Sequence, residues 1–221
     1  MFRLKLAAII GGLVMLFMGF QEFRVSSGTT SEPENASLAE IEAGQIPDNT
    51  HLAIAEHAAI YPAAVYSYST SKYGSSEPTN STKVNYCYYP IMSSTHPFLV
   101  SLGKIQEKYG NLGGVPQQEI PQIEGLGVLV KTSRFKTIGT IPEEWKNESG
   151  VKGLVINRIA SLSDEEKKLI QESFPNVNLD TVLILQEGRE PSSALASLGL
   201  MFGGLLISGA GGAWMFVGRR E

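Results

Sequence analysis

The chain has 221 residues, of which 43% are hydrophobic, and a mild formal net charge of −4 at pH 7. This length suits one ordinary domain or two small ones, and the composition is that of a folded protein. The sequence has no basic cluster long enough to neutralise a run of phosphates, so nucleic acid is not an expected partner.

The N-terminal segment 1–23 is apolar from residue 6 to residue 20 and carries Arg3 and Lys5 ahead of that run. As a helix the run spans about 22 Å. A longer part of the helix can lie in the bilayer when Lys5 directs its ammonium group back toward the interface. We interpret the segment as an uncleaved transmembrane signal anchor, because an A-x-A cleavage site is missing. The alternative is a signal peptide cleaved among the small residues 25–28.

The following residues, 24–36, are polar without an apolar period and predict a flexible tether. A short helix is expected over 37–44. Ser37 can cap its N-terminus, Glu40 stands at the capping-box position, and Gly44 can end it.

The central residues 37–190 predict one α+β domain with a mixed sheet or a small barrel, because strand-like segments dominate first and a strand-helix-strand unit comes last. The helix of that unit covers 163–174, with Ser163 as cap and Glu166 at the capping-box position. An irregular stretch, 96–124, interrupts the order and includes a possible helix over 98–110. The expected strands lie within 50–57, 63–70, 82–92, 125–135, 151–160 and 181–187.

Tyrosine is concentrated in this domain, since seven of the eight tyrosines lie between residues 61 and 89. If 63–70 and 82–92 form a hairpin, Tyr66 and Tyr68 share one face of its first strand, and Tyr86 and Tyr88 share one face of its second. We expect cross-strand aromatic pairing to stabilise the hairpin. The alternative is that these four residues form a binding face for a protein partner or a sugar ring.

The single cysteine, Cys87, lies in the second of these strands. One thiol forms no intrachain disulfide and supplies no structural zinc site by itself. We interpret it as a small apolar side chain, with an intermolecular disulfide or a reactive thiol as the alternatives.

The C-terminal segment 191–218 predicts a second transmembrane helix, because residues 194–217 contain no charged side chain and would extend about 36 Å as a helix. A phosphate-binding loop is disfavoured, since Trp214 takes the place of the third glycine after Gly209 and Gly211. Small residues recur at helical spacing in both apolar segments and predict helix-packing positions. These positions are Gly11, Gly12, Gly199, Gly203, Gly204, Ser208 and Gly212.

The positive charges orient both segments alike. Arg3 and Lys5 precede the first helix, and Arg219 and Arg220 lie in the tail 219–221 after the second. Since positively charged flanks favour the cytoplasmic side, both termini are expected in the cytoplasm and the domain outside it. Three N-x-[ST] sites fall in that external region and serve as acceptors only in a eukaryotic secretory host: Asn35, Asn80 and Asn147.

Few residues of the chain form a recognisable chemical motif. The histidines His51, His57 and His96 have no metal-ligand spacing, and neither a metal nor a cofactor is expected. Ser101 and Lys104 form an S-x-x-K, which on a helix places a nucleophile and a lysine base on one face. The same pattern recurs, however, at Ser69/Lys72, Ser133/Lys136 and Ser149/Lys152.

We therefore expect a two-pass integral membrane protein without evident catalysis. In this hypothesis the extracytoplasmic domain binds or helps assemble a membrane-protein partner, or the chain self-associates through the small-residue faces of its helices within the lipid bilayer. The alternative is a membrane-anchored envelope hydrolase that uses Ser101 and Lys104.

Overall fold

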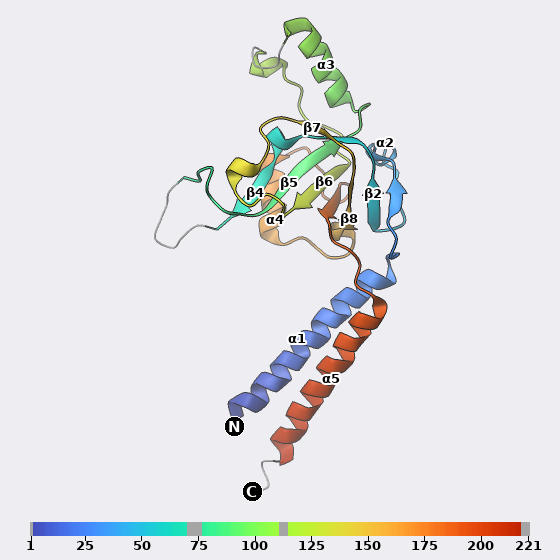
Figure 1. Cartoon of the computed structure of the whole chain (residues 1–221), viewed down its shortest axis with the longest axis vertical. Helices are drawn as coiled ribbons and strands as arrows, with labels where there is room; N and C mark the ends of the chain where they lie inside the picture. The colour runs from blue at the N-terminus through green and yellow to red at the C-terminus, as the bar shows by residue number, and fades with distance from the viewer. Residues whose placement is uncertain (1, 70–76, 111–114, 218–221) are drawn as a thin grey trace. The chain divides into compact units, whose positions relative to one another are not determined.

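The computed structural model describes residues 2–69, 77–110 and 115–217 (Figure 1). The chain divides into two compact units, one formed by Met1–Glu32 with Glu190–Glu221 and one formed by Pro33–Arg189. The first is called the helical hairpin below and the second the domain. Arg219 and Arg220, on which part of the expected orientation rests, lie outside the described residues.

The helical hairpin consists of α1, Phe2–Ser27, and α5, Ala194–Val217. Two stretches, Arg3–Ser26 and Ala194–Trp214, are long and apolar enough to cross a membrane. The helices pack antiparallel, since residues early in α1 lie against residues late in α5. Lys5 donates a hydrogen bond to the carbonyl of Trp214 at 2.8 Å, so the start of α1 and the end of α5 lie together.

The domain contains one mixed nine-stranded sheet that curls into a half-barrel, which confirms the α+β class. The strands follow the order β1-β2-β8-β9-β6-β5-β3-β7, and β4 pairs with the first half of β5. Their bounds are β1 Glu34–Ala36, β2 His51–Ile54, β3 His57–Ala59, β4 Val65–Tyr68, β5 Val84–Met92, β6 Val128–Thr132, β7 Lys146–Glu148, β8 Val151–Val155 and β9 Leu183–Glu187.

The two faces of the sheet bury different sets of residues. Strands from both ends of the sheet contribute to one cluster, including Ile54, Ala59, Tyr89 and Leu185, which identifies that face as the inside of the curl. The other face packs against α4, Asp164–Ser173, through Tyr88, Leu129, Ile170, Phe174 and Ile184. Alternation along β5 therefore fills both cores from a single strand.

The short helices begin where their capping residues predict. Ser37 caps α2, Leu38–Glu42, and its side chain accepts a hydrogen bond from the Glu40 N–H. Gly44 follows with a φ of +90°, in the left-handed region that glycine adopts without strain. Ser163 and Glu166 form both halves of the capping box at the start of α4. These expectations are confirmed because capping depends on neighbours within one helical turn.

One segment departs from the sequence-based map. The segment 24–36 contains regular structure at both ends, since α1 continues to Ser27 and β1 pairs in parallel with β2. The strands flanking α4, β8 and β9, run antiparallel to each other and β9 runs parallel to β6, so the sheet is mixed as expected. The remaining helix is α3, Pro97–Tyr109, which confirms the helix expected within the irregular stretch. Short 3-10 turns complete the domain at Tyr61–Ala63, Gln117–Glu119, Ile138–Thr140 and Ile156–Arg158.

Candidate functional site

At its closest points, the contact between α1 and α5 places a glycine against the backbone of the other helix. A Cβ atom on Gly12 would lie 2.6 Å from the backbone nitrogen of Ser208, and one on Gly204 would lie 2.6 Å from the carbonyl oxygen of Gly12. Farther along, a Cβ atom on Gly19 would lie 2.8 Å from the backbone nitrogen of Met201 and 3.0 Å from the carbonyl oxygen of Ser197. The two backbones therefore approach as closely as small residues permit.

The predicted helix-packing positions are distributed around the helices. The structure brings Gly12, Gly204 and Ser208 together, and Gly203 lies at the margin, with a Cβ position 3.6 Å from the methyl group of Met15. Gly11, Gly199 and Gly212 have no described atom within 4 Å of their Cβ positions. They lie on the outward sides of the hairpin.

Three contact residues were missed by the sequence analysis: Gly19, Ser197 and Gly211. Ser197 is fully buried, and a Cβ atom on Gly211 would lie 3.0 Å from the side chain of Ile9. The available signal is a seven-residue period, since Ser197, Gly204 and Gly211 recur every seven positions, as Gly12 and Gly19 do. A period of seven keeps residues on one face of packed helices.

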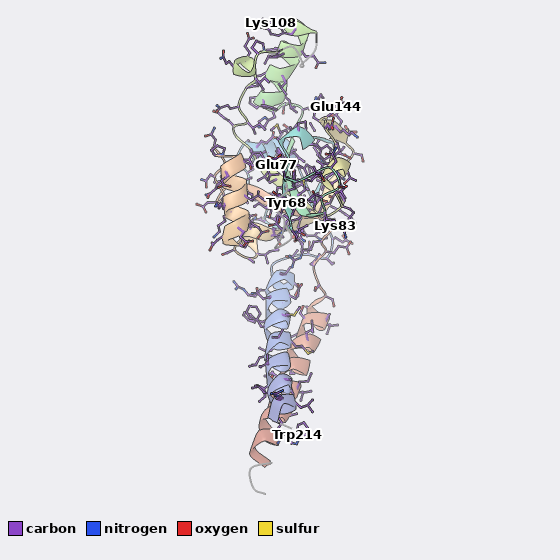
Figure 2. The ribbon with its side chains drawn as sticks, turned by 90° about the vertical axis from the view of Figure 1, so that its left-hand side faces the viewer. Tyr68, Glu77, Lys83, Lys108, Glu144 and Trp214 are labelled. Carbon is purple, nitrogen blue, oxygen red and sulfur yellow. The ribbon has the colours of Figure 1, made fainter. Side chains whose placement is uncertain are left out.

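In the domain, a groove of about 790 Å³ separates α3 from β3 and β7. Both figures show α3 projecting from the sheet, with Lys108 near its outer end in Figure 2. None of the thirteen residues of this helix, all of which are described, is buried. The groove is lined by Glu56, His57, Ala58, Ser94, Leu99, Leu102, Gly103, Gln106, Trp145, Asn147, Glu148 and Ser149.

The floor of the groove is set by the pairing of β3 with β7. Ala58 stands opposite Asn147, so both side chains lie on one face of the sheet, and alternation places Trp145 on the same face. Glu148 alternates to the inner face, where its Oε1 accepts a 2.7 Å hydrogen bond from the Tyr61 hydroxyl. Glu148 therefore belongs both to the wall of the groove and to a cluster behind it.

That cluster surrounds Arg134, which follows the end of β6. Its guanidinium lies 3.2 Å from a carboxylate oxygen of Glu187 and 3.7 Å from one of Glu148, and it donates to the Tyr61 hydroxyl. It also lies 4.9 to 5.7 Å from the ring centres of Tyr61, Tyr89 and Phe135. Four distant segments thus meet at one cation, through ion pairs and cation–π contacts.

Burial shifts the pKa values of groups in and beside the Arg134 cluster. It raises the pKa of Tyr61 well above its ordinary value, and the hydrogen bond to Glu148 adds to the effect. Burial also lowers the pKa of His57, against the opposing influence of its 2.8 Å contact with the Ala55 carbonyl. Among the described residues, neither His57 Nε2 nor Glu187 Oε2 has a hydrogen-bond partner, although both atoms are buried.

The opposite face of the sheet carries a second polar cluster, beneath α4. Glu166 accepts hydrogen bonds from Lys131, Tyr88 and Ser163. Burial by itself would raise the pKa of this carboxyl, but these hydrogen bonds outweigh burial and lower it to about 2. The ammonium of Lys131 also lies 4.6 Å from the ring centre of Tyr86. Lys131 is therefore held by an ion pair and an aromatic face.

Tyr66 and Tyr68 share one face of β4, and Tyr86 and Tyr88 share one face of β5, but the two pairs lie on opposite faces of the sheet. Tyr66 stands opposite Cys87, while Val65 and Ser67 stand opposite Tyr88 and Tyr86. Tyr66 and Tyr68 therefore pack with each other on the inner side of the sheet, with centroids 6.2 Å apart, and Tyr86 and Tyr88 pair 5.6 Å apart on the α4 side. The expected cross-strand pairing of tyrosines is not formed, because the register places Tyr66 opposite Cys87, one residue away from Tyr86 and Tyr88. Tyr73 lies outside the described residues.

Ser101 and Lys104 both lie on α3, where Ser101 is half-buried and Lys104 is exposed. In the described part of the chain, no hydrogen bond joins them and neither lines the groove. Lys72, from another copy of the pattern, lies outside the described residues. The same described ranges contain no group of three His, Cys, Asp or Glu side chains able to hold a metal ion.

Cys87 is fully buried in the inner core, where burial raises the pKa of its thiol to about 12. A thiol that stays protonated and inaccessible is a poor nucleophile. This placement agrees with a small apolar side chain rather than a reactive one.

Comparison of the chain with protein-family models, with curated proteins and with solved structures gave no match.

Proposed function

We propose that the chain is a two-pass integral membrane protein whose domain lies on the extracytoplasmic side and binds or helps assemble a membrane-protein partner. The two apolar helices support membrane insertion. Their antiparallel packing supports placing both ends of the chain on one side. Arg3 and Lys5 favour the cytoplasm for that side.

The observation that carries partner binding is the groove beneath α3. Helices in proteins gain most of their stability by packing an apolar face, yet no residue of α3 is buried. Leu99 is half-buried against the small core of Ala58, Ile60 and Met92 and lines the groove together with Leu102, while the large side chain of Trp145 is 42% exposed beside them. A surface of this kind is suited to being covered by another polypeptide.

The experiment that tests this proposal is purification of the full chain from its native membranes in a mild detergent, with quantification of the proteins that accompany it. We expect one membrane protein in a fixed molar ratio to the chain. Light scattering distinguishes this complex from self-association, because the mass of a homo-oligomer is a multiple of the 23.9 kDa chain. Recovery of the chain alone as a monomer, under conditions that preserve known membrane complexes of the same cells, contradicts the proposal.

A further inference from the structure

The apolar wall of the groove is one face of a helix. Leu99, Leu102 and Gln106 follow the spacing i, i+3, i+7 and face the sheet together. Trp145 stands on the sheet side of the same groove, so Leu102 and Trp145 provide apolar surface on its two walls. The volume of about 790 Å³ lies within the usual range of binding sites.

The sheet wall of the groove ends in an open strand edge. The Ile60 N–H donates to the Pro90 carbonyl in β5, so alternation directs the backbone groups of Ala58 to β5 and those of His57 and Ala59 to β7. The backbone N–H and C=O of Asn147, opposite Ala58, consequently point away from β3. Within the described ranges no strand pairs with that side of β7, which is the last strand of the sheet order.

The charges around the groove have one sign. Glu56 and Glu148 are the charged residues among its described lining, which includes no lysine or arginine. The carboxylate of Glu148 is already engaged by Tyr61 and Arg134, whereas Glu56 is exposed. The groove therefore complements a cationic side chain, and it disfavours an acidic one.

We propose that the groove binds an extended segment of the partner polypeptide, which adds a strand to the outer edge of β7. An apolar side chain of that segment enters between Leu102 and Trp145, and a lysine or arginine of the segment lies toward Glu56. Strand addition takes its affinity from backbone hydrogen bonds and its specificity from the pockets for alternate side chains. The inference rests on the proposed function, since it names the surface that the partner uses.

The test uses a phage-displayed library of random heptapeptides, selected on the full chain in mild detergent and counter-selected on the variant Leu102→Asp. We expect enriched peptides to carry a lysine or arginine close to a large apolar residue. In fluorescence anisotropy, Leu102→Asp should weaken an enriched peptide at least about tenfold, because it places a charge on the apolar wall. Val100→Asp is the matched control, because Val100 lies on the same helix, is 45% exposed and does not line the groove.

Two further changes, one in the chain and one in the peptide, distinguish loss of this binding geometry from loss of folding. Glu56→Lys changes an exposed residue and should reverse the preference, so that peptides with glutamate in place of the basic residue bind more tightly. N-methylation of the peptide amide that faces β7 should abolish binding, since it removes a backbone donor. Absence of enrichment, equal binding to the wild-type chain and Leu102→Asp, enrichment of acidic peptides, or tolerance of N-methylation at every amide overturns the inference.

The native membranes provide a separate readout. A partner that co-purifies equally with the wild-type chain and with Leu102→Asp overturns the groove assignment and leaves the proposed function in place. Recovery of every version of the chain alone contradicts the proposed function itself. The two failures are therefore distinguishable.

Discussion

The ammonium nitrogen of Lys131 lies 2.5 Å from the Oε1 oxygen of Glu166, and this contact joins β6 to the helix that covers it. Both side chains are largely buried, with 19% and 14% of their surfaces exposed. Each charge is therefore compensated mainly by the other, and removal of one partner leaves the second in a poorly solvated place.

Lys131→Met is expected to lower the free energy of unfolding of the domain by about 1–3 kcal/mol, because the Glu166 carboxylate loses its cation. Glu166→Gln should have a comparable effect, while the double variant should lose less than the sum of the two. Urea unfolding followed by far-ultraviolet circular dichroism measures all four proteins of the cycle. Strictly additive losses would show that the contact contributes no coupling energy.

The same carboxylate predicts a pH dependence. Because the pKa of Glu166 in the folded chain is about 2, below the ordinary value of about 4.3 for an unfolded chain, its contribution to stability is fully present above about pH 5. It declines as the pH falls through about 4 and is lost toward pH 2. Glu166→Gln should remove this part of the acid dependence. An identical decline between pH 5 and pH 2.5 in both proteins contradicts the assignment.

Arg134→Met is expected to destabilise the domain by about 1–3 kcal/mol, because Glu148 and Glu187 lose their shared cation and three aromatic rings lose a planar partner. Arg134→Lys should recover only part of the loss, since an ammonium lacks the flat guanidinium fork. The control is Lys136→Met, an exposed residue that donates to one backbone carbonyl, with an expected change within about 0.5 kcal/mol. Equal effects of the Met variants would indicate that the Arg134 cluster contributes no special stability.

Adjacent glycines in α1 give a matched pair for the helical hairpin. Gly12→Leu should separate α1 from α5, because Ser208 and Gly204 occupy the space of the new side chain, whereas Gly11→Leu meets no described atom. Cysteines at positions 8 and 211, which lie in contact, report the packing through disulfide formation in detergent. We expect cross-linking to fall with Gly12→Leu and to persist with Gly11→Leu. The reverse order would show that α1 is rotated.

Orientation is testable with an impermeant thiol reagent. Cys87 is buried and should stay unlabelled until the protein is denatured, so it serves as an internal control for folding. A cysteine at the exposed position of Glu172 in α4 should react in intact cells if the domain faces outward. Labelling only after permeabilisation would reverse the proposed topology.

The sequence predicts what depends on neighbouring residues. The capping residues Ser37 and Ser163 and the two long apolar segments are of this kind, and the structure contains helices at each of them. The strand β1 was missed because its side chains are mostly exposed at the sheet edge and show no apolar alternation. The residues of β1 therefore do not predict a strand by their own propensity, although pairing with β2 orders the segment.

Contacts between distant segments could not be read from the sequence. The rotation of a helix decides whether Gly11 or its neighbour Gly12 meets the opposite helix, and composition is nearly the same on both faces. The Arg134 cluster likewise gathers Tyr61, Glu148 and Glu187, each unremarkable in its own segment. Only the curl of the sheet brings these three side chains to one cation.

The position of β9 determines when this sheet can be completed during synthesis. It lies between β8 and β6 and pairs with both of them. Yet it is the last strand to be translated, ending at Glu187, shortly before α5 begins at Ala194. Because chains fold from the N-terminus as they emerge, β6 and β8 lack this shared partner until the ribosome finishes the domain. Closure of the sheet then coincides with delivery of the second apolar helix.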